Sequence, residues 1–219
     1  MKYHLSKTPA RKLPSIHEEK FKFGREMHDI IKIYYTKIPT NITPGEVKFE
    51  IIRLSRKKFG DLTDDLTTHI NGFVRFEKER LTWSRNNKPI SIEKEYRKGL
   101  YHGYPDIILN KNGKKIVADW KTGYEFIKSL TDSMKIQGKI YKDITESDEM
   151  VFVFIRTGWT IPLTEDDEKK AEILINKVIK GIEKREFNRI NNKKKCNECE
   201  YQISCYMKQH NINWWEVLC

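Results

Sequence analysis

The sequence predicts an α/β fold with a mixed central sheet flanked by helices and a C-terminal tail that contains cysteines. Apolar residues follow helical spacing in the first third of the chain, and the middle then changes to short strand-like runs separated by turns. One more helix, strand and helix follow, an order typical of a sheet covered by helices on both faces. With 219 residues, the chain is long enough for one sizeable core.

Helices are expected before the first strand. Ser15 and Glu18 form a capping-box pattern ahead of a helical stripe of apolar and aromatic residues. Two prolines and a glycine predict a loop over residues 39–45. Residues 46–59 have the pattern of a helix. A further helix from Asp61 carries these residues on one face: Leu62, Leu66, Ile70 and Phe73.

The middle of the chain predicts strands. Residues 90–96 alternate between apolar and polar side chains, and residues 104–109 form a short, mostly apolar run. Asn112-Gly113 is a strong signal for a hairpin turn, so residues 114–120 are expected to form the partner strand. A helix over about 129–145 and a buried strand over 150–156 come next. Thr164 then caps an acidic helix start that we expect to continue to about Phe187.

This order divides the chain into two predicted parts. Residues 1–187 would form the core, with an N-terminal helical part. Residues 188–219 would form a basic linker and a cysteine-rich tail, which is too short to fold alone and is therefore expected to pack on the core.

Composition points to a polyanionic partner. The net charge is +11 and the sequence pI is about 9.3, which suggests nucleic acid, although a Lys-rich solvated surface is the simpler alternative. The sequence has no run of about 18 apolar residues and no apolar stretch near its start, so no membrane partner is expected. We expect a cytoplasmic, intracellular protein; the composition would also fit a viral protein acting in a host cell.

Two acids and a lysine form the main candidate site. Asp119 and Lys121 lie two apart on a predicted strand and therefore share a face, and Asp106 lies on the preceding strand of the same hairpin. Carboxylates suit Mg²⁺ or Mn²⁺, and such an ion with a nearby ammonium suits hydrolysis of a phosphodiester. The alternative is an ordinary surface ion pair.

The residues around this site resemble a known family. The run Val117–Gly123 is similar to the D-x-K-T-G signature of RecB-like nucleases, within the PD-(D/E)XK nucleases. Gln137 and Tyr141 resemble the Gln-x-x-x-Tyr motif of the following helix, and Gly24 followed by His28 resembles an early metal-binding motif. Glu93 or Glu95 matches a strand acid that precedes the motif aspartate, and the sequence leaves open which one points inward.

The resemblance implies a restriction-endonuclease-like core and a Mg²⁺- or Mn²⁺-dependent deoxyribonuclease. Single-stranded DNA or DNA ends would be cut to leave a 5′-phosphate and a 3′-hydroxyl. It implies His28, Asp106 and Asp119 as metal ligands. The catalytic residues that it implies are Asp106, Asp119, Lys121, Gln137 and Tyr141. The alternatives are a non-catalytic nucleic-acid-binding protein with a structural metal and a structure-selective endonuclease such as a junction resolvase. Exonuclease or endonuclease action and a homo-oligomeric state stay open.

Aromatic side chains offer a second possible contact with a single strand, because a base can stack on an aromatic ring. Most of these residues are expected in the core instead. They are Tyr34, Tyr35, Trp83, Tyr101, Tyr104 and Trp120.

A cysteine cluster follows the core. Cys196, Cys199 and Cys205 lie within ten residues, and in a reducing compartment they are expected as ligands or free thiols. Their spacing resembles the iron–sulfur segment of the CRISPR-associated RecB-like nucleases, in which an early cysteine completes a 4Fe–4S cluster. This chain has no cysteine before Cys196, so the fourth ligand would be Cys219, a histidine such as His210, a non-protein group, or nothing. Zn²⁺ and an absence of metal are the alternatives.

Overall fold

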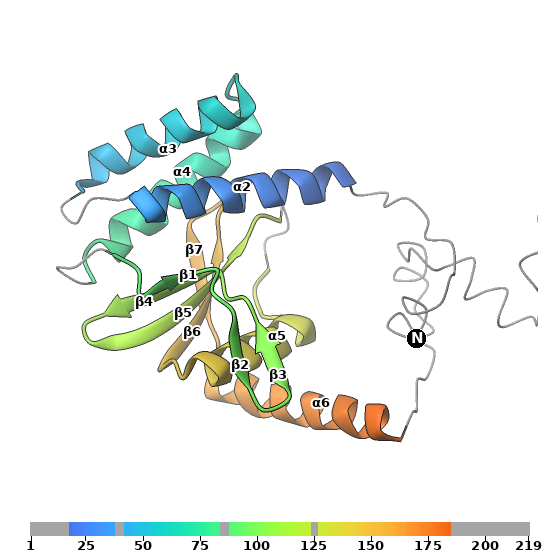
Figure 1. The fold of residues 1–219 in the computed structure, drawn as a ribbon. Helices are drawn as coiled ribbons and strands as arrows, with labels where there is room; N and C mark the ends of the chain where they lie inside the picture. Colours follow the sequence, from blue (N-terminus) through green and yellow to red (C-terminus); the bar gives the residue numbers. More distant parts are fainter. Residues whose placement is uncertain (1–17, 38–41, 84–87, 124–126, 185–219) are drawn as a thin grey trace, which may run out of the picture. The chain divides into compact units, whose positions relative to one another are not determined.

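The computed structural model describes residues 18–37, 42–83, 88–123 and 127–184 (Figure 1). The chain divides into two compact units. Residues Phe23–Lys177 form the larger one, and the two ends of the chain form the other. Of that second unit only residues 18–22 and 178–184 are described. The sheet and the candidate site belong to the larger unit.

A five-stranded mixed sheet forms the centre of the larger unit, in the order β1-β4-β5-β6-β7. β5 and β6 are parallel and the other neighbouring pairs are antiparallel. The predicted mixed sheet is therefore confirmed. Its strands are β1 (Ser91–Ile92), β4 (Ile107–Lys111), β5 (Lys114–Lys121), β6 (Glu149–Phe154) and β7 (Trp159–Pro162).

Helices cover both faces of this sheet (Figure 1). One face packs against α2 (Glu18–Lys37), α3 (Pro44–Phe59) and α4 (Asp64–Arg80), and the opposite face packs against α5 (Asp132–Thr145). α6 (Glu165–Glu183) lies beside α5, where Glu168 and Glu172 form ion pairs with α5 lysines. Side chains along β5 point alternately to the two faces of the sheet. Ile116, Ala118 and Trp120 therefore pack in one hydrophobic core, and Val117 packs in the other. The chain thus has the α/β core that the sequence predicts.

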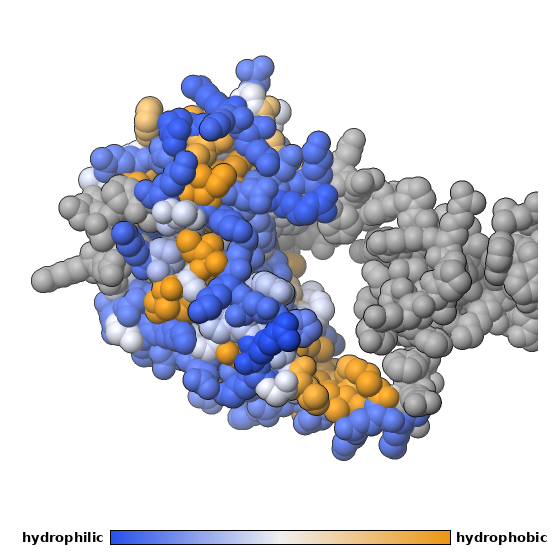
Figure 2. Space-filling view, viewed as in Figure 1, coloured by the Kyte–Doolittle hydropathy of each residue, from blue (hydrophilic) through white to orange (hydrophobic). Residues whose placement is uncertain are grey.

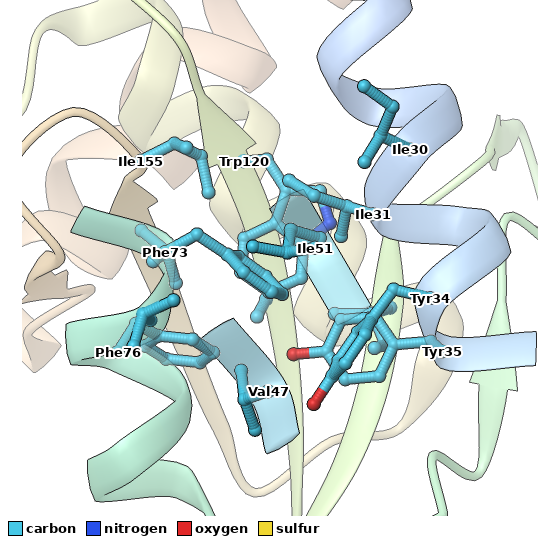
Figure 3. Packing of buried hydrophobic residues seen from close by; sticks show 14 of the residues in the cluster. Ile30, Ile31, Tyr34, Tyr35, Val47, Ile51, Phe73, Phe76, Trp120 and Ile155 are labelled. Carbon is cyan, nitrogen blue, oxygen red and sulfur yellow. The ribbon is translucent and has the colours of Figure 1, made fainter. Parts of the chain in front are cut away.

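The larger core is rich in aromatic rings (Figure 3). Trp120 stacks on Tyr35, with 6.0 Å between ring centroids, and meets Phe73 and Phe76 edge-on. Tyr34, Tyr35, Trp83 and Trp120 are all buried, as expected for core residues. The two remaining aromatic candidates are Tyr101 and Tyr104, of which Tyr104 is exposed.

The strand predicted over residues 90–96 is wrong. β1 ends at Ile92 because Glu93 has a positive φ of 42°, which breaks the extended backbone. A small hairpin of β2 (Tyr96–Lys98) and β3 (Tyr101–Gly103) then pairs outside the main sheet. The alternation of apolar and polar residues continues through Glu93, so the sequence pattern did not indicate that the strand ends there.

Residues typical of turns predicted the structure better than the alternation of residues 90–96 did. Asn112 and Gly113 both have positive φ, at 52° and 89°, as the predicted β4–β5 hairpin turn requires. The loop predicted over residues 39–45 ends earlier than expected, because Thr43 caps α3 and Pro44 occupies its first turn. β7 was not predicted: it is a four-residue edge strand that ends in Pro162.

The remaining helices begin at threonine caps. Thr63 and Thr131 accept hydrogen bonds from the first turns of α4 and α5, so both helices start about three residues later than predicted. Thr164 bonds to Asp167 at the start of α6, as expected. Ser15 and residues 185–187, in the predicted helix ends, lie outside the described residues.

The face of the molecule in Figure 2 is mainly hydrophilic. Over α6, apolar side chains gather on the surface, and Ile173, Val178 and Ile182 are exposed there. In the described part of the chain, every helix is too short or too polar for a membrane span. The predicted linker and tail, 188–219, lie outside the described residues.

Candidate active site

Three acids lie in one row across neighbouring strands. Ile92 pairs with Ile107 and Ile107 pairs with Ala118, so one further step along each strand places Glu93, Asp106 and Asp119 side by side. The backbone N–H of Glu93 donates to the carbonyl of Asp106 at 3.0 Å, which continues the β1–β4 pairing to this row. The carboxyl end of β5 therefore carries an acidic strip.

His28 of α2 faces this strip. Its Nδ1 lies 3.3 Å from Oδ1 of Asp106, and one ligand atom each of His28, Glu93 and Asp106 lies within 4.8 Å of the others. Burial lowers the pKa of His28, but its hydrogen bond to Asp106 and the nearby carboxylates raise that pKa more. An imidazole and two carboxylates in this arrangement match the donors that bind a divalent ion.

Backbone contacts fix these acids. Oδ2 of Asp106 accepts a 2.7 Å hydrogen bond from the backbone N–H of Trp120, which leaves Oδ1 for His28. The sequence left open whether Glu93 or Glu95 points into the site. Glu93 belongs to the acidic group, whereas Glu95 pairs with Arg97. The positive φ of Glu93 sets the direction of its side chain.

Asp119 is the most buried acid of the row, with a side chain only 6% exposed. Burial and the neighbouring charge of Asp106 raise its pKa to about 6, although Lys121 and His28 act in the opposite direction. Its Oδ2 lies 2.6 Å from Nζ of Lys121, yet it accepts no well-aligned hydrogen bond among the described residues. A buried carboxylate oxygen with lone pairs to spare is suited to a cation.

Gln137 of α5 joins the acid and the lysine. Its Nε2 donates to Oδ1 of Asp119 at 3.0 Å, and its Oε1 accepts from Nζ of Lys121 at 2.9 Å. Tyr141, one turn later on α5, hydrogen-bonds to Gln137, which lowers the tyrosine pKa; burial and the charges of Asp119 and Asp106 raise it more. The phenol therefore stays protonated at neutral pH.

Two glycines allow helices to approach this site closely. A Cβ at Gly24 would lie 3.0 Å from Oγ1 of Thr122, so α2 passes directly over the end of β5. A Cβ at Gly103 would lie 2.7 Å from the ring of Tyr141. The spacing from Gly24 to His28 thus has a physical reason: the helix touches the sheet at the glycine and places His28 one turn further on.

His69 is a site-supporting residue that the sequence did not reveal. It is fully buried on α4, with Nδ1 2.8 Å from the carbonyl of Asp65 and Nε2 3.3 Å from the carbonyl of Thr122. Phe23 packs edge-on against its ring. His69 therefore ties α4 to the residue directly after Lys121, and no spacing in the sequence indicates a contact 53 residues away.

The structure brings together all six of the residues singled out by sequence in the core: His28, Asp106, Asp119, Lys121, Gln137 and Tyr141. Glu93, which is not one of these six, takes the place of Asp119 in the set of mutually close ligand atoms with His28 and Asp106. Cys196, Cys199, Cys205 and Cys219 lie outside the described residues.

Comparisons with known proteins agree with this arrangement at the level of family. A family model described as the PD-(D/E)XK nuclease superfamily matches residues 1–206. No curated protein matches the chain. A solved structure described as "Crystal structure of SSO0001" aligns over 84% of this chain and 96% of its own, with 14% identity and a TM-score of 0.36, a likeness too low to carry an argument.

Proposed function

Because the chain belongs to the PD-(D/E)XK nuclease superfamily, we propose that it is a metal-dependent deoxyribonuclease whose active site is the acidic row at the end of β5. The observation that carries this proposal is the position of Asp119. It is a buried carboxylate held by Gln137 and Lys121, beside the group formed by His28, Glu93 and Asp106.

The donor set supports Mg²⁺ or Mn²⁺ as the ion. Asp106, Asp119 and Glu93 supply carboxylate oxygens, which both ions prefer, and the imidazole of His28 favours Mn²⁺ more than Mg²⁺. A bound divalent cation would neutralise charge on a phosphodiester and make a coordinated water more acidic. His28, Asp106 and Asp119 are the ligands that we propose, with Glu93 added on the strength of its position.

Lys121 and Gln137 would act on the reacting groups. The Lys121 side chain is 28% exposed and its ammonium contacts both Asp119 and Gln137, so it can orient an attacking water or hold a phosphate oxygen. Gln137 fixes both partners through its two amide atoms. Tyr141 stays protonated at neutral pH and would hold Gln137 in place through the hydrogen bond between them.

Two features support single-stranded DNA or DNA ends as the substrate. The net charge of +11 favours a polyanion, and Tyr104 is 55% exposed two residues before Asp106, so its ring is free to stack on a base beside the site. Together with the D-x-K-T-G-like run, they favour a RecB-like enzyme that leaves a 5′-phosphate and a 3′-hydroxyl.

Cleavage of labelled single-stranded DNA with Mn²⁺ tests the proposal. The wild type should cut, and Asp119→Asn, which keeps the shape of the side chain, should bind DNA but lose activity by about 10³-fold. Asp166→Asn is the matched control, because Asp166 is exposed on α6. If wild type and Asp119→Asn both bind and neither cuts, the chain is a nucleic-acid-binding protein instead.

The form of the substrate distinguishes the remaining alternatives. Cutting of circular single-stranded DNA would establish an endonuclease, whereas cutting only of linear DNA would establish an exonuclease. A panel of single strands, duplexes, flaps and four-way junctions would identify a junction resolvase by its preference for junctions. Gel filtration of the same sample reports whether the protein is a homo-oligomer.

We make a separate proposal for the cysteine tail, that its cysteines bind a metal centre. A 4Fe–4S cluster on Cys196, Cys199 and Cys205, with Cys219 as fourth ligand, would give a brown protein with broad visible absorption; Zn²⁺ would leave it colourless but detectable by metal analysis. Cys199→Ser should remove either metal. The hydrolytic residues lie elsewhere, so cleavage should persist in that variant.

A further inference from the structure

Lys32 contacts the acidic group from outside the motifs that the sequence revealed. Its Nζ lies 2.5 Å from Oε2 of Glu93, and Glu93 is one of the three residues whose ligand atoms lie within 4.8 Å of one another. Lys32 is four residues after His28 on α2, so the two side chains share a helix face. The ammonium therefore lies at the edge of the cation site itself.

The pair is exposed enough to exchange partners. The side chain of Lys32 is 48% exposed and that of Glu93 is 28% exposed. The only hydrogen bond that the described residues give this ammonium is the one to Glu93. Exposed ion pairs of this kind contribute little to stability, so another cation can replace one partner at small cost.

Resting on the function proposed above, we propose that Lys32 competes with the divalent cation for Glu93 and, once displaced, becomes a contact for a phosphate of the nucleic acid. A divalent ion held by Glu93, His28 and Asp106 repels the ammonium and takes over its carboxylate. The flexible lysine stem then leaves a positive charge beside the ion, where a substrate phosphate must lie.

Two properties should change together when Lys32 is removed. In Lys32→Met the cation binds an uncontested Glu93, so the Kd for Mn²⁺ should fall by about two- to fivefold, the range that an exposed ion pair allows. DNA affinity should weaken in the presence of a divalent ion, and the logarithmic salt slope for a single strand should become shallower by about 0.7, the loss of one phosphate contact. With chelator present, the loss of DNA affinity should be smaller.

Isothermal titration calorimetry with Mn²⁺ alone tests the first property, and fluorescence anisotropy of labelled single-stranded DNA with Ca²⁺ or with chelator tests the second. Lys114→Met is the matched control, because Lys114 forms an exposed pair with Glu149 at 3.0 Å, at the opposite end of β5 from the site. Lys32→Arg should retain most of the competition. Circular dichroism checks that each variant is folded.

The outcomes separate this inference from the function on which it rests. Equal Mn²⁺ affinity in wild type, Lys32→Met and Lys114→Met, with binding lost in His28→Ala, overturns the role of Lys32 and leaves the metal site standing. An equal loss of DNA affinity with and without divalent ion shows that Lys32 is an ordinary surface charge and also overturns the exchange. If the wild type itself binds no Mn²⁺, the proposed function fails first and the inference fails with it.

Discussion

At the scale of single residues, the burial of Asp119 determines the pH at which its carboxyl ionises. Its carboxyl has a pKa raised to about 6, so it is largely protonated below that pH and ionised above it. We propose Asp119 as a metal ligand, and a ligand must be ionised, so protons should compete with the ion; at subsaturating Mn²⁺, cleavage should therefore fall as pH drops through about 6. A pH–rate profile with Mn²⁺ checks this, and an unchanged rate down to about pH 5 would contradict it.

The same shift has a consequence for stability without metal. A carboxyl whose pKa is higher in the folded than in the unfolded state binds its proton more tightly when folded. Its contribution to the free energy of unfolding is therefore favourable at low pH and is lost as pH rises from about 4 to about 6. Urea titrations in chelator should show the difference between wild type and Asp119→Asn declining over that interval; a constant difference would argue against the shift.

Loss of Glu77 should strongly destabilise the fold. It is fully buried on α4, pairs with Arg80 at 2.5 Å, and accepts hydrogen bonds from the hydroxyls of Tyr34 and Tyr35 on α2. Burial and the charge of Glu77 raise the pKa of both tyrosines, so they remain donors. This network fixes α2, the helix that carries His28.

Glu77→Ala should lower the free energy of unfolding by about 3–5 kcal/mol, because it leaves the buried Arg80 without its carboxylate. Glu79→Ala, at an exposed position on the same helix, should change it by less than about 0.5 kcal/mol. Urea denaturation measures both. Similar values for the two variants would show that the buried network contributes nothing specific.

At the scale of secondary-structure elements, Gly72 sets the contact between α4 and the turn that joins β6 to β7. A Cβ at Gly72 would lie 2.0 Å from the carbonyl oxygen of Ile155, and one at Gly158 would lie 2.3 Å from the carbonyl oxygen of Gly72. Both obstacles are backbone atoms, which cannot rotate away. α4 and this turn therefore meet backbone to backbone.

Gly72→Ala should push α4 away from the sheet and cost about 1–3 kcal/mol or more, although alanine is the better helix former. Gly45→Ala is the contrasting control, since nothing lies within 4 Å of a Cβ there and the residue is in the first turn of α3. That change should be neutral or slightly stabilising. In thermal denaturation, the melting temperature should fall for Gly72→Ala and stay the same or rise slightly for Gly45→Ala.

Elements were predictable where local chemistry decides them. The Asn112-Gly113 turn, the helices and the change of face along β5 all follow from spacing and side-chain preference. The β2–β3 hairpin and β7 were missed because each is only three or four residues long, too short for a periodic pattern. The sequence narrowed the strand acid to Glu93 or Glu95, and only the positive φ of Glu93 and the strand register decide between them. His69 could be found only by a tertiary contact.

At the scale of the whole molecule, charge should govern binding to DNA. With a net charge of +11, affinity for single-stranded DNA should fall steeply and linearly on a logarithmic plot as salt rises, largely independent of sequence. Anisotropy titrations with Asp119→Asn, the variant that we expect not to cleave, measure this slope. Strong sequence dependence at constant salt would instead point to contacts with base edges.

Three acids come from the sheet, but His28 comes from a helix above it. Any ion that binds all of them joins two layers of the protein, so its binding energy also resists unfolding. At an ion concentration of 100 times its Kd, the gain is about 2.7 kcal/mol. Mn²⁺ should therefore raise the melting temperature of the wild type, and Asp106→Asn should largely lose the increase. The heat resistance of the protein would then report how much of the proposed metal site is occupied.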